Sequence, residues 1–104
     1  MPKESGWTIT AYCGCNSCCG KEDLKSASGK VLSNLDAYRV CAAPSTFKFN
    51  TLIKISGGWV GNVTVVDRGG AIQGKRIDVF VGDKSKHQEA LKFGKKVNCT
   101  VDYD

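Results

Sequence analysis

Hydrophobic and polar residues alternate over short stretches along most of the chain, and this pattern predicts strands. In the first stretch one face carries Trp7, Ile9, Ala11 and Cys13 and the other carries Thr8, Thr10 and Tyr12, as in a strand with one buried face. Turn residues such as Pro44-Ser45 and Gly57-Gly58 separate further β-rich stretches. These are Tyr38–Ala43, Thr51–Ser56, Trp59–Val66, Ile77–Val81 and Val97–Tyr103. Repeated short strands favour a sandwich or a barrel.

One short helix is expected before the last strand. Ser85 and Gln88 have the spacing of a capping box, and the helix should run to Phe93, where Gly94 fits its C-terminal stop. His87, the only histidine, shares a helical face with Ala90 and Leu91, so we expect it to pack or face solvent rather than catalyse. Lys21–Leu35 is polar and predicts a loop with room for one helical turn at Glu22–Lys25.

Length and composition indicate one domain over residues 1–104. The chain has 41% hydrophobic residues and 2 prolines, enough for one modest core. No stretch approaches the roughly 18 apolar residues of a membrane span, and Met1–Gly6 lacks an apolar signal segment. We therefore expect a soluble chain whose export route is not encoded in it. The net charge of +5 suits any polyanion and does not choose among nucleic acid, membrane and cell wall.

Six cysteines are many for this length, and four of them, Cys13, Cys15, Cys18 and Cys19, lie within seven residues. In an oxidising compartment the six would form a disulfide framework, for which 15 pairings exist. In a reducing compartment the four clustered thiolates could hold zinc, although their spacing is not that of two regular C-x-x-C knuckles. We favour disulfides. Cys99 can also be interpreted as a small buried hydrophobic residue, because it alternates with Val97, Val101 and Tyr103.

Two carboxylates stand in apolar surroundings. Asp67 ends the run Val63–Val66, and Asp78 lies within Ile77–Val81. A buried carboxylate costs several kcal/mol unless it is paired or hydrogen-bonded, and its pKa tends to rise. A carboxyl group that keeps its proton near neutrality suits acid catalysis of glycoside cleavage. The glycines between them would let a turn bring both carboxylates to one barrel mouth, with Lys75 and Arg76 at its rim.

Structural roles compete with this interpretation. Asp67, which precedes Arg68-Gly69-Gly70, could bond only the amides of its own turn. Asp78 could pair with Arg68, Lys75 or Arg76, or face solvent on the polar side of its strand.

Longer motifs resemble a known family. They are Ala11-Tyr12-Cys13-x-Cys15-x-x-Cys18-Cys19-Gly20-Lys21, Ala42-Ala43-Pro44, Asn50-Thr51, the segment from Val65-Val66-Asp67-Arg68-Gly69-Gly70 to Gly74-x-Arg76-Ile77-Asp78-Val79-Phe80, and Ala90-Leu91-x-Phe93-Gly94. Together they resemble the 3D domain family, named for three aspartates, which is similar to the catalytic barrel of membrane-bound lytic transglycosylase A and to the stationary-phase survival muralytic enzymes. The resemblance covers nearly the whole chain.

The resemblance implies a six-stranded double-psi β-barrel and non-hydrolytic cleavage of the β-1,4 bond between N-acetylmuramic acid and N-acetylglucosamine. Asp78 matches the general acid/base, and Asp67 matches the second aspartate, which would position substrate or stabilise an oxocarbenium-like charge. Thr10 and Tyr12 would contact sugar, Tyr12 by stacking, while Gly69, Gly74 and Arg76 would form the groove and its rim. We expect peptidoglycan as partner, no cofactor, a monomer, and a place outside the cell or in the wall or periplasm.

The first family aspartate is missing, because this chain has Ala43-Pro44 and Asn50-Thr51 where the family has Asp-Pro and Gly-Thr. Three hypotheses therefore remain: a lytic transglycosylase, which we favour, a noncatalytic wall-binding module, and a zinc or redox domain built on the cysteines. Specific nucleic-acid binding is less favoured, since Trp7, Trp59 and the lysines form no clustered basic and aromatic patch.

Overall fold

Six strands form a closed barrel in the computed structural model, which describes residues 3–14, 25–68, 72 and 74–103. The strands are β1 (Lys3–Gly14), β2 (Val40–Ala42), β3 (Leu52–Ser56), β4 (Gly61–Asp67), β5 (Arg76–Asp83) and β6 (Lys96–Tyr103). Around the barrel they follow the order β1-β5-β2-β4-β3-β6. The six strands and the barrel expected from the sequence are confirmed, as is one short helix before the last strand.

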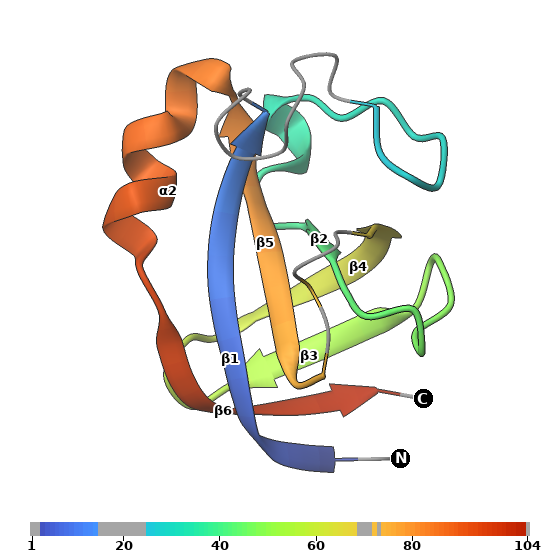
Figure 1. The fold of residues 1–104 in the computed structure, drawn as a ribbon, viewed down its shortest axis with the longest axis vertical. Coiled ribbons are helices and arrows are strands. Elements are labelled where there is room, and N and C mark those ends of the chain that lie inside the picture. Colours follow the sequence, from blue (N-terminus) through green and yellow to red (C-terminus); the bar gives the residue numbers. More distant parts are fainter. Residues whose placement is uncertain (1–2, 15–24, 69–71, 73, 104) are drawn as a thin grey trace.

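Parallel pairs give this barrel its connectivity. β1 pairs in parallel with β5, and β2 pairs in parallel with β4, while the remaining neighbours are antiparallel. Figure 1 shows β1 and β5 side by side, crossing in front of β3, β4 and β6. Strands that are far apart in the sequence thus become neighbours, and side chains of β1 and β5 share one face of the barrel.

The barrel interior is filled by every second side chain of the strands, as the alternation predicted. Ile9 of β1 and Ile77 and Val79 of β5 point inward, and none of the three is exposed. This inner cluster comprises Trp7, Ile9, Cys41, Ala43, Phe47, Ile53, Ile55, Val63, Val65, Ile77, Val79, Cys99 and Val101. Its closed packing fixes the register of the strands, because a one-residue slip would turn each inward side chain outward.

The opposite, outward face of the same strands is partly buried. Side chains on this outward face, such as Tyr12 on β1 and Phe80 on β5, pack in a second cluster with Leu32 and Ile72 from the connecting segments. The full outward cluster is Tyr12, Leu32, Val40, Ala42, Val66, Ile72 and Phe80. Segments outside the barrel strands therefore cover part of the outward surface of β1, β2, β4 and β5.

The last strand begins with an irregularity that the alternation did not predict. Val97 is exposed, whereas Cys99 and Val101 are buried as expected. Asn98 has a φ of 56°, and the pairing of β1 with β6 shifts register between Trp7 and Ile9. This bulge turns Val97 to solvent.

The helical segment begins differently from the capping-box prediction. A 3-10 turn, η2 (Lys84–Lys86), comes first, and the Asp83 side chain caps it by accepting from the Ser85 amide. The helix α2 (His87–Phe93) has no side-chain cap from its N-cap residue, so the predicted Ser85–Gln88 box is wrong. Gly94, with a φ of 64°, ends the helix as expected. A second 3-10 turn, η1, covers Asn34–Asp36.

The cysteines divide between the core and the rest of the chain. Cys41 and Cys99 are free, fully buried thiols in the inner cluster, so the framework joining all six cysteines is wrong and the interpretation of Cys99 as a buried hydrophobe is confirmed. Cys15, Cys18 and Cys19 lie outside the described residues. Among the described segments, no helix is long and apolar enough to span a membrane.

Phe80 tests the importance of the outward cluster. Its side chain is fully buried, and truncation to alanine should lower the free energy of unfolding by about 3–5 kcal/mol. Leu35, which is 85% exposed, is the matched control, and Leu35→Ala should change the free energy of unfolding by less than about 0.5 kcal/mol. Urea denaturation followed by tryptophan fluorescence measures both. Equal losses in the two variants would mean that the outward cluster is not packed as described.

Candidate active site

A row of four residues crosses the outward face of the barrel on four neighbouring strands. Thr10 of β1 pairs with Asp78 of β5, and Asp78 pairs with Ala42 of β2, which in turn pairs with Asp67 of β4. Adjacent strands lie about 4.8 Å apart, so two strand spacings place the Cα atoms of the two aspartates roughly 10 Å apart. The two carboxylates are thus brought together as predicted, but on the outward face and not at the barrel mouth.

A bulge at the end of β4 places Asp67 in this row. Cys41 pairs with Val65, whereas the next residue, Ala42, pairs with Asp67, so Val66 is the extra residue. Val66 joins the outward cluster and Asp67 is turned toward the same surface. Bulges of this kind often direct a side chain at a functional site.

The carboxylate of Asp67 is held by three donors. Its Oδ1 accepts from the backbone amides of Ala27 and Arg68, each at 2.9 Å, and its Oδ2 accepts from the Tyr12 hydroxyl at 3.4 Å. One donor belongs to its own turn, as the structural alternative expected, but the other two come from distant segments. Asp67 therefore has a fixed orientation, with its acceptor capacity largely used by protein groups.

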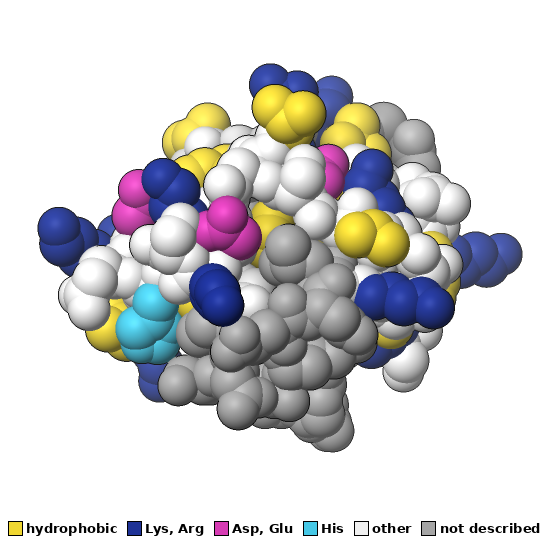
Figure 2. All heavy atoms as spheres, turned by 90° about the horizontal axis from the view of Figure 1, so that it is seen from above, with side chains coloured by type: hydrophobic (Ala, Val, Ile, Leu, Met, Phe, Trp, Pro, Cys, Tyr) yellow, Lys and Arg dark blue, Asp and Glu magenta, His cyan; other side chains and the backbone are white. Residues whose placement is uncertain are grey.

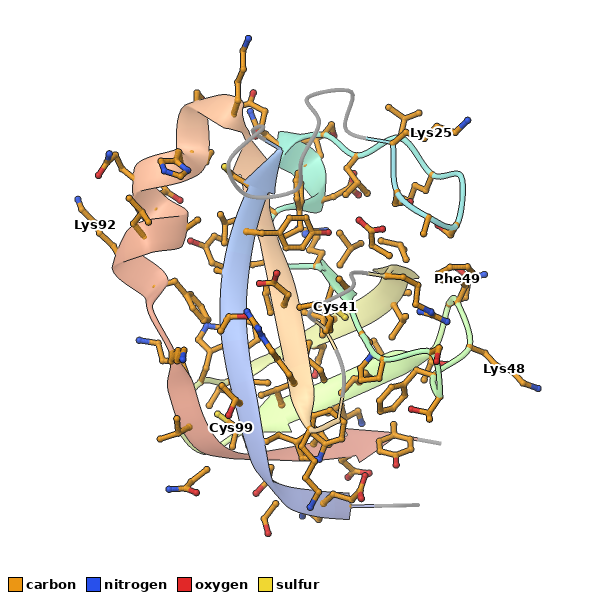
Figure 3. The ribbon with its side chains drawn as sticks, in the orientation of Figure 1. Lys25, Cys41, Lys48, Phe49, Lys92 and Cys99 are labelled. Carbon is orange, nitrogen blue, oxygen red and sulfur yellow. The ribbon has the colours of Figure 1, made fainter. Side chains whose placement is uncertain are left out.

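Arg68 fixes the backbone beside Asp67. Its guanidinium donates to the carbonyl oxygens of Asp67 and Phe47, and it lies over the Phe49 ring with the Cζ 4.2 Å from the ring centroid. Figure 3 shows Phe49 near the end of β4, on the side of the barrel away from α2. Arg68 thus attaches the segment between β2 and β3 to the end of β4. Its guanidinium binds backbone carbonyl oxygens rather than Asp78.

Asp78 has a different environment. The Thr10 hydroxyl donates to its Oδ1 at 2.9 Å, and the Arg76 guanidinium donates to Thr10 Oγ1 from Nε at 3.4 Å and from Nη2 at 3.5 Å. Because Arg76 occupies the lone pairs of Thr10, the hydroxyl proton is directed at Asp78. The Arg76 charge acts on Asp78 and its guanidinium donates to Thr10, whereas Arg68 donates to backbone carbonyl oxygens.

Burial dominates the ionisation of Asp78. Loss of solvent raises the pKa of its carboxyl group above the ordinary value, while the Thr10 hydrogen bond and the Arg76 charge lower the pKa and the Asp67 charge raises it. The net direction is upward. Two carboxyl groups in contrasting environments on one face are the arrangement in which one acts as an acid and the other as an anion.

Thr10 and Tyr12 share a face as predicted, but that face is enclosed. Thr10 is 7% exposed and Tyr12 is 6% exposed, so neither side chain is open for a sugar to stack on. The Tyr12 ring packs on Phe80 with 5.5 Å between ring centroids, and burial, followed by the charges of Asp67 and Asp78, raises the pKa of its hydroxyl. Tyr12 is thus a neutral hydrogen-bond donor that holds Asp67.

The remaining predicted residues lie at the margin of this face. Arg76 is half-buried beside Thr10, and Gly74, with a φ of 66°, is exposed in the turn before β5. Gly69 lies outside the described residues. Beneath the row, Cys41 points inward, and burial together with the charge of Asp78 raises the pKa of its thiol to about 12, so the thiol stays neutral.

Sequence reasoning missed one donor of the site. The Ala27 amide belongs to a turn in which the Ser26 hydroxyl donates to the Lys30 carbonyl and the Ser28 amide donates to the Val66 carbonyl. These bonds attach the turn to the end of β4. Nothing in the sequence of this polar segment indicates that its backbone serves Asp67, since a backbone amide has no residue signature.

The model of the 3D domain family matches residues 39–101, more than half of the chain. The chain belongs to the 3D domain family. The matched part includes Asp67 and Asp78 of the candidate site, while Thr10, Tyr12 and Ala27 precede it. No curated protein matches the sequence.

The barrel itself is similar to a solved structure, the crystal structure of MltA from E. coli, with a TM-score of 0.58 and 16% sequence identity. The similarity covers 79% of this chain and 28% of that chain, so this 3D domain spans little more than a quarter of MltA. At this identity the likeness shows a common fold.

Ala43, at which the family would have its first aspartate, belongs to the inner cluster. Its side chain is fully buried with that cluster, and its amide donates to the Asp67 carbonyl at 3.3 Å. The side chain of residue 43 therefore does not contribute to the outward face that carries Asp67 and Asp78. The missing aspartate leaves their hydrogen bonds to Thr10, Tyr12 and Ala27 in place.

The raised pKa of Asp78 predicts how stability depends on pH. Below the ordinary value of 3.8 the group is protonated in both states, and above it the unfolded chain ionises while the folded protein keeps its proton. The free energy of unfolding therefore falls as pH rises from 3.8 to the folded-state pKa, and stays at the lower level above it.

Asn at position 78 cannot ionise, so Asp78→Asn should stabilise the folded protein at neutral pH and do so less at pH 3. Denaturant unfolding of parent and variant at both pH values measures this difference. A stability difference that is the same at pH 3 and pH 7 would contradict the burial of an ionisable carboxyl group at this position.

Proposed function

We propose that this 3D domain is a peptidoglycan lytic transglycosylase, with Asp78 as its general acid/base. The observation that carries the proposal is the pair of carboxyl groups on the outward face: Asp78 is half-buried with a raised pKa, and Asp67 is held by three donors. Membership of the 3D family and the barrel shared with MltA support it. A substrate of this kind implies a site of action outside the cell or in the wall or periplasm.

The first step would be acid catalysis. The protonated Asp78 carboxyl group donates its proton to the oxygen of the β-1,4 bond between N-acetylmuramic acid and N-acetylglucosamine, and the bond from that oxygen to C1 of the muramic acid breaks. A raised pKa favours the protonated form that this step requires. Positive charge develops at C1 and its ring oxygen, and Asp78 is left as a carboxylate.

The second step would use that carboxylate as a base. Asp78 removes the proton of the C6 hydroxyl of the same muramic acid, and O6 bonds to C1 to close a 1,6-anhydro ring. The proton lost in the first step is thereby regained, and no water is consumed. The substrate supplies its own nucleophile, so one acid/base residue suffices.

The neighbours of Asp78 would stabilise the charge that develops on the substrate and would hold the catalytic carboxyl group in position. Asp67, as a fixed anion, would stabilise the positive charge that develops at C1, which is the kind of preorganised electrostatic contribution that enzymes rely on. Thr10, ordered by Arg76, would keep the Asp78 carboxyl group in one orientation. Tyr12 would act through Asp67 and is a positioning residue. Gly74 would leave room for the glycan at the margin of the site.

A noncatalytic wall-binding module is the second candidate. The observation that favours it is Ala43 in place of the first family aspartate, since a barrel that lost part of its catalytic set can keep its glycan-binding surface. The two candidates differ in whether bound peptidoglycan is cleaved. The zinc or redox hypothesis rests on Cys13, Cys15, Cys18 and Cys19, and the last three of these lie outside the described residues.

Mass spectrometry of muropeptides released from insoluble peptidoglycan tests the proposal. The parent should release 1,6-anhydro products, which are one water lighter than hydrolysis products. Asp78→Asn should lower their rate of release at least about a hundredfold, because proton transfer is lost, and should retain binding to the wall. Asp36→Asn, which removes one acidic side chain at η1, is the matched control and should stay active.

Ordinary reducing-end products would overturn the mechanism while keeping the substrate. Wall that binds the parent without release of fragments would establish the binding module. An Asp78→Asn variant as active as the parent would exclude Asp78 as the acid/base.

The environment of Asp78 also predicts the pH profile. Because the first step needs the protonated carboxyl group, kcat/KM should fall as pH rises through the pKa of Asp78 in the free enzyme. Thr10→Val removes a hydrogen bond that lowers this pKa, so the fall should move to higher pH. Asp67→Asn removes a charge that raises the pKa, so the fall should move to lower pH. Cleavage rates on soluble glycan fragments from pH 4 to 9 measure these pH profiles. Identical profiles in the parent and the two variants would contradict the assignment of Asp78 as the general acid.

A further inference from the structure

Phe49 presents an aromatic side chain to solvent near Asp67. It lies in the turn between β2 and β3 and is 36% exposed. Among the described aromatic side chains only Tyr38 and Phe49 are exposed, and the Tyr38 hydroxyl donates to Glu89 of α2. Figure 3 shows Phe49 on the side of the barrel away from α2, near the end of β4. Phe49 is therefore the exposed aromatic residue on the Asp67 side of the candidate site.

The row of site residues continues toward Phe49. The row crosses β1, β5, β2 and β4 and ends at Asp67, and β3 is the next strand around the barrel. The chain before β3 already runs beside β4, because the Asn50 amide donates to the Val65 carbonyl at 2.7 Å and the Val65 amide donates to the Thr51 carbonyl at 2.9 Å. Phe49 comes one residue before this pairing and Asp67 two residues after it. The two residues thus lie at the same end of neighbouring antiparallel segments.

Arg68 holds the Phe49 ring in place. Its Cζ lies 4.2 Å from the ring centroid, and the same guanidinium donates to the carbonyl oxygens of Asp67 and Phe47. A single guanidinium group therefore joins the ring of Phe49 to the backbone of Asp67. A side chain that is ordered before a ligand arrives loses little conformational entropy on binding.

The chemistry of this ring suits a sugar. Arg68 covers one face, so the exposed part of the side chain includes the other face. The face of an aromatic ring is negative, and the C–H groups on one side of a pyranose are weakly positive, so the two stack with apolar contact. Figure 2 shows the Lys and Arg side chains dispersed over the end of the barrel seen there, with no single basic patch among the described residues. Stacking rather than charge is therefore the recognition that this surface offers.

We propose that Phe49 is the stacking platform of a glycan subsite next to Asp67, where its free face binds a pyranose unit of the peptidoglycan strand. The identity of this ligand rests on the proposed function. The sequence indicated stacking at Tyr12, but Tyr12 is buried, and the structure transfers that role to Phe49. Phe49 carries no group that can transfer a proton, so it contributes to binding and not to the acid/base steps at Asp78.

Binding of soluble glycan oligomers to the full chain tests the subsite. The oligomers alternate N-acetylglucosamine and N-acetylmuramic acid, and the protein carries Asp78→Asn so that they stay intact during isothermal titration. Adding Phe49→Ala should weaken binding about tenfold, because a stacked sugar loses its partner. Phe49→Trp should keep the affinity. Phe49→Leu retains an apolar side chain without an aromatic face and should lose most of it.

Leu91→Ala is the matched control. Leu91 is 60% exposed on α2, which lies on the other side of the barrel, and its truncation should leave glycan affinity unchanged. Urea denaturation shows that each variant is folded before titration. Phe49→Ala that binds as tightly as Leu91→Ala would overturn the proposal, as would Phe49→Leu that binds as tightly as Phe49→Trp. Absence of glycan binding by the Asp78→Asn protein would overturn it too.

The subsite and the lytic activity fail in different ways. If the parent releases 1,6-anhydro products while Phe49→Ala binds glycan like the control, the lytic activity stands and the subsite is refuted. If glycan binding depends on Phe49 and the parent releases no products, the subsite stands and the lytic activity is refuted.

Discussion

The partial burial of the Asp78 carboxyl group is the constraint on which the proposed chemistry depends. An aspartate in a barrel strand would ordinarily face solvent and ionise, but here Tyr12, Phe80 and the segments that contribute Leu32 and Ile72 cover part of the outward face, and Asp78 is half-buried. Enclosure removes water from the carboxyl group and raises its pKa. The Thr10 hydroxyl supplies one hydrogen bond, which compensates for only part of that lost solvation.

The barrel topology makes this environment possible. Because β1 and β5 are parallel neighbours, Thr10 and Asp78 lie in register although 68 residues separate them. Because β2 lies between β5 and β4, Asp67 reaches the same face with one strand between. The inner cluster fixes these registers, and a slip of one residue would exchange the face that carries Asp67 and Asp78 with the core. Stability of the interior and placement of the site are therefore one property of the fold.

Much of this arrangement could be predicted from the sequence. The period of two around Trp7 and Ile9, and the apolar neighbours of Asp67 and Asp78, indicated the strands and the two unusual carboxylates. Burial of the second face of β1 could not be predicted, because it depends on Leu32 and Ile72, which are distant in the chain. Thr10 and Tyr12 were therefore expected to contact sugar, whereas both side chains are buried.

Backbone contributions were equally hidden from the sequence. The amide of Ala27 bonds Asp67 from a loop, and the bulge at Val66 turns Asp67 to the outward face. The cap from Asp83 replaced the expected one from Ser85, because the chain forms a 3-10 turn before the helix. Side-chain identity constrains such features weakly, since every residue except proline can donate a backbone amide.

The pKa of Asp78 in the free protein tests the account most directly. Carbon-13 NMR of the labelled side-chain carboxyl group, followed from pH 2 to 9, gives that value without a substrate. The account predicts a midpoint above 3.8, the ordinary value for aspartate, because burial outweighs the Thr10 hydrogen bond and the Arg76 charge. A midpoint at or below 3.8 would show that Asp78 is an ordinary ionised aspartate, and would contradict its role as the acid.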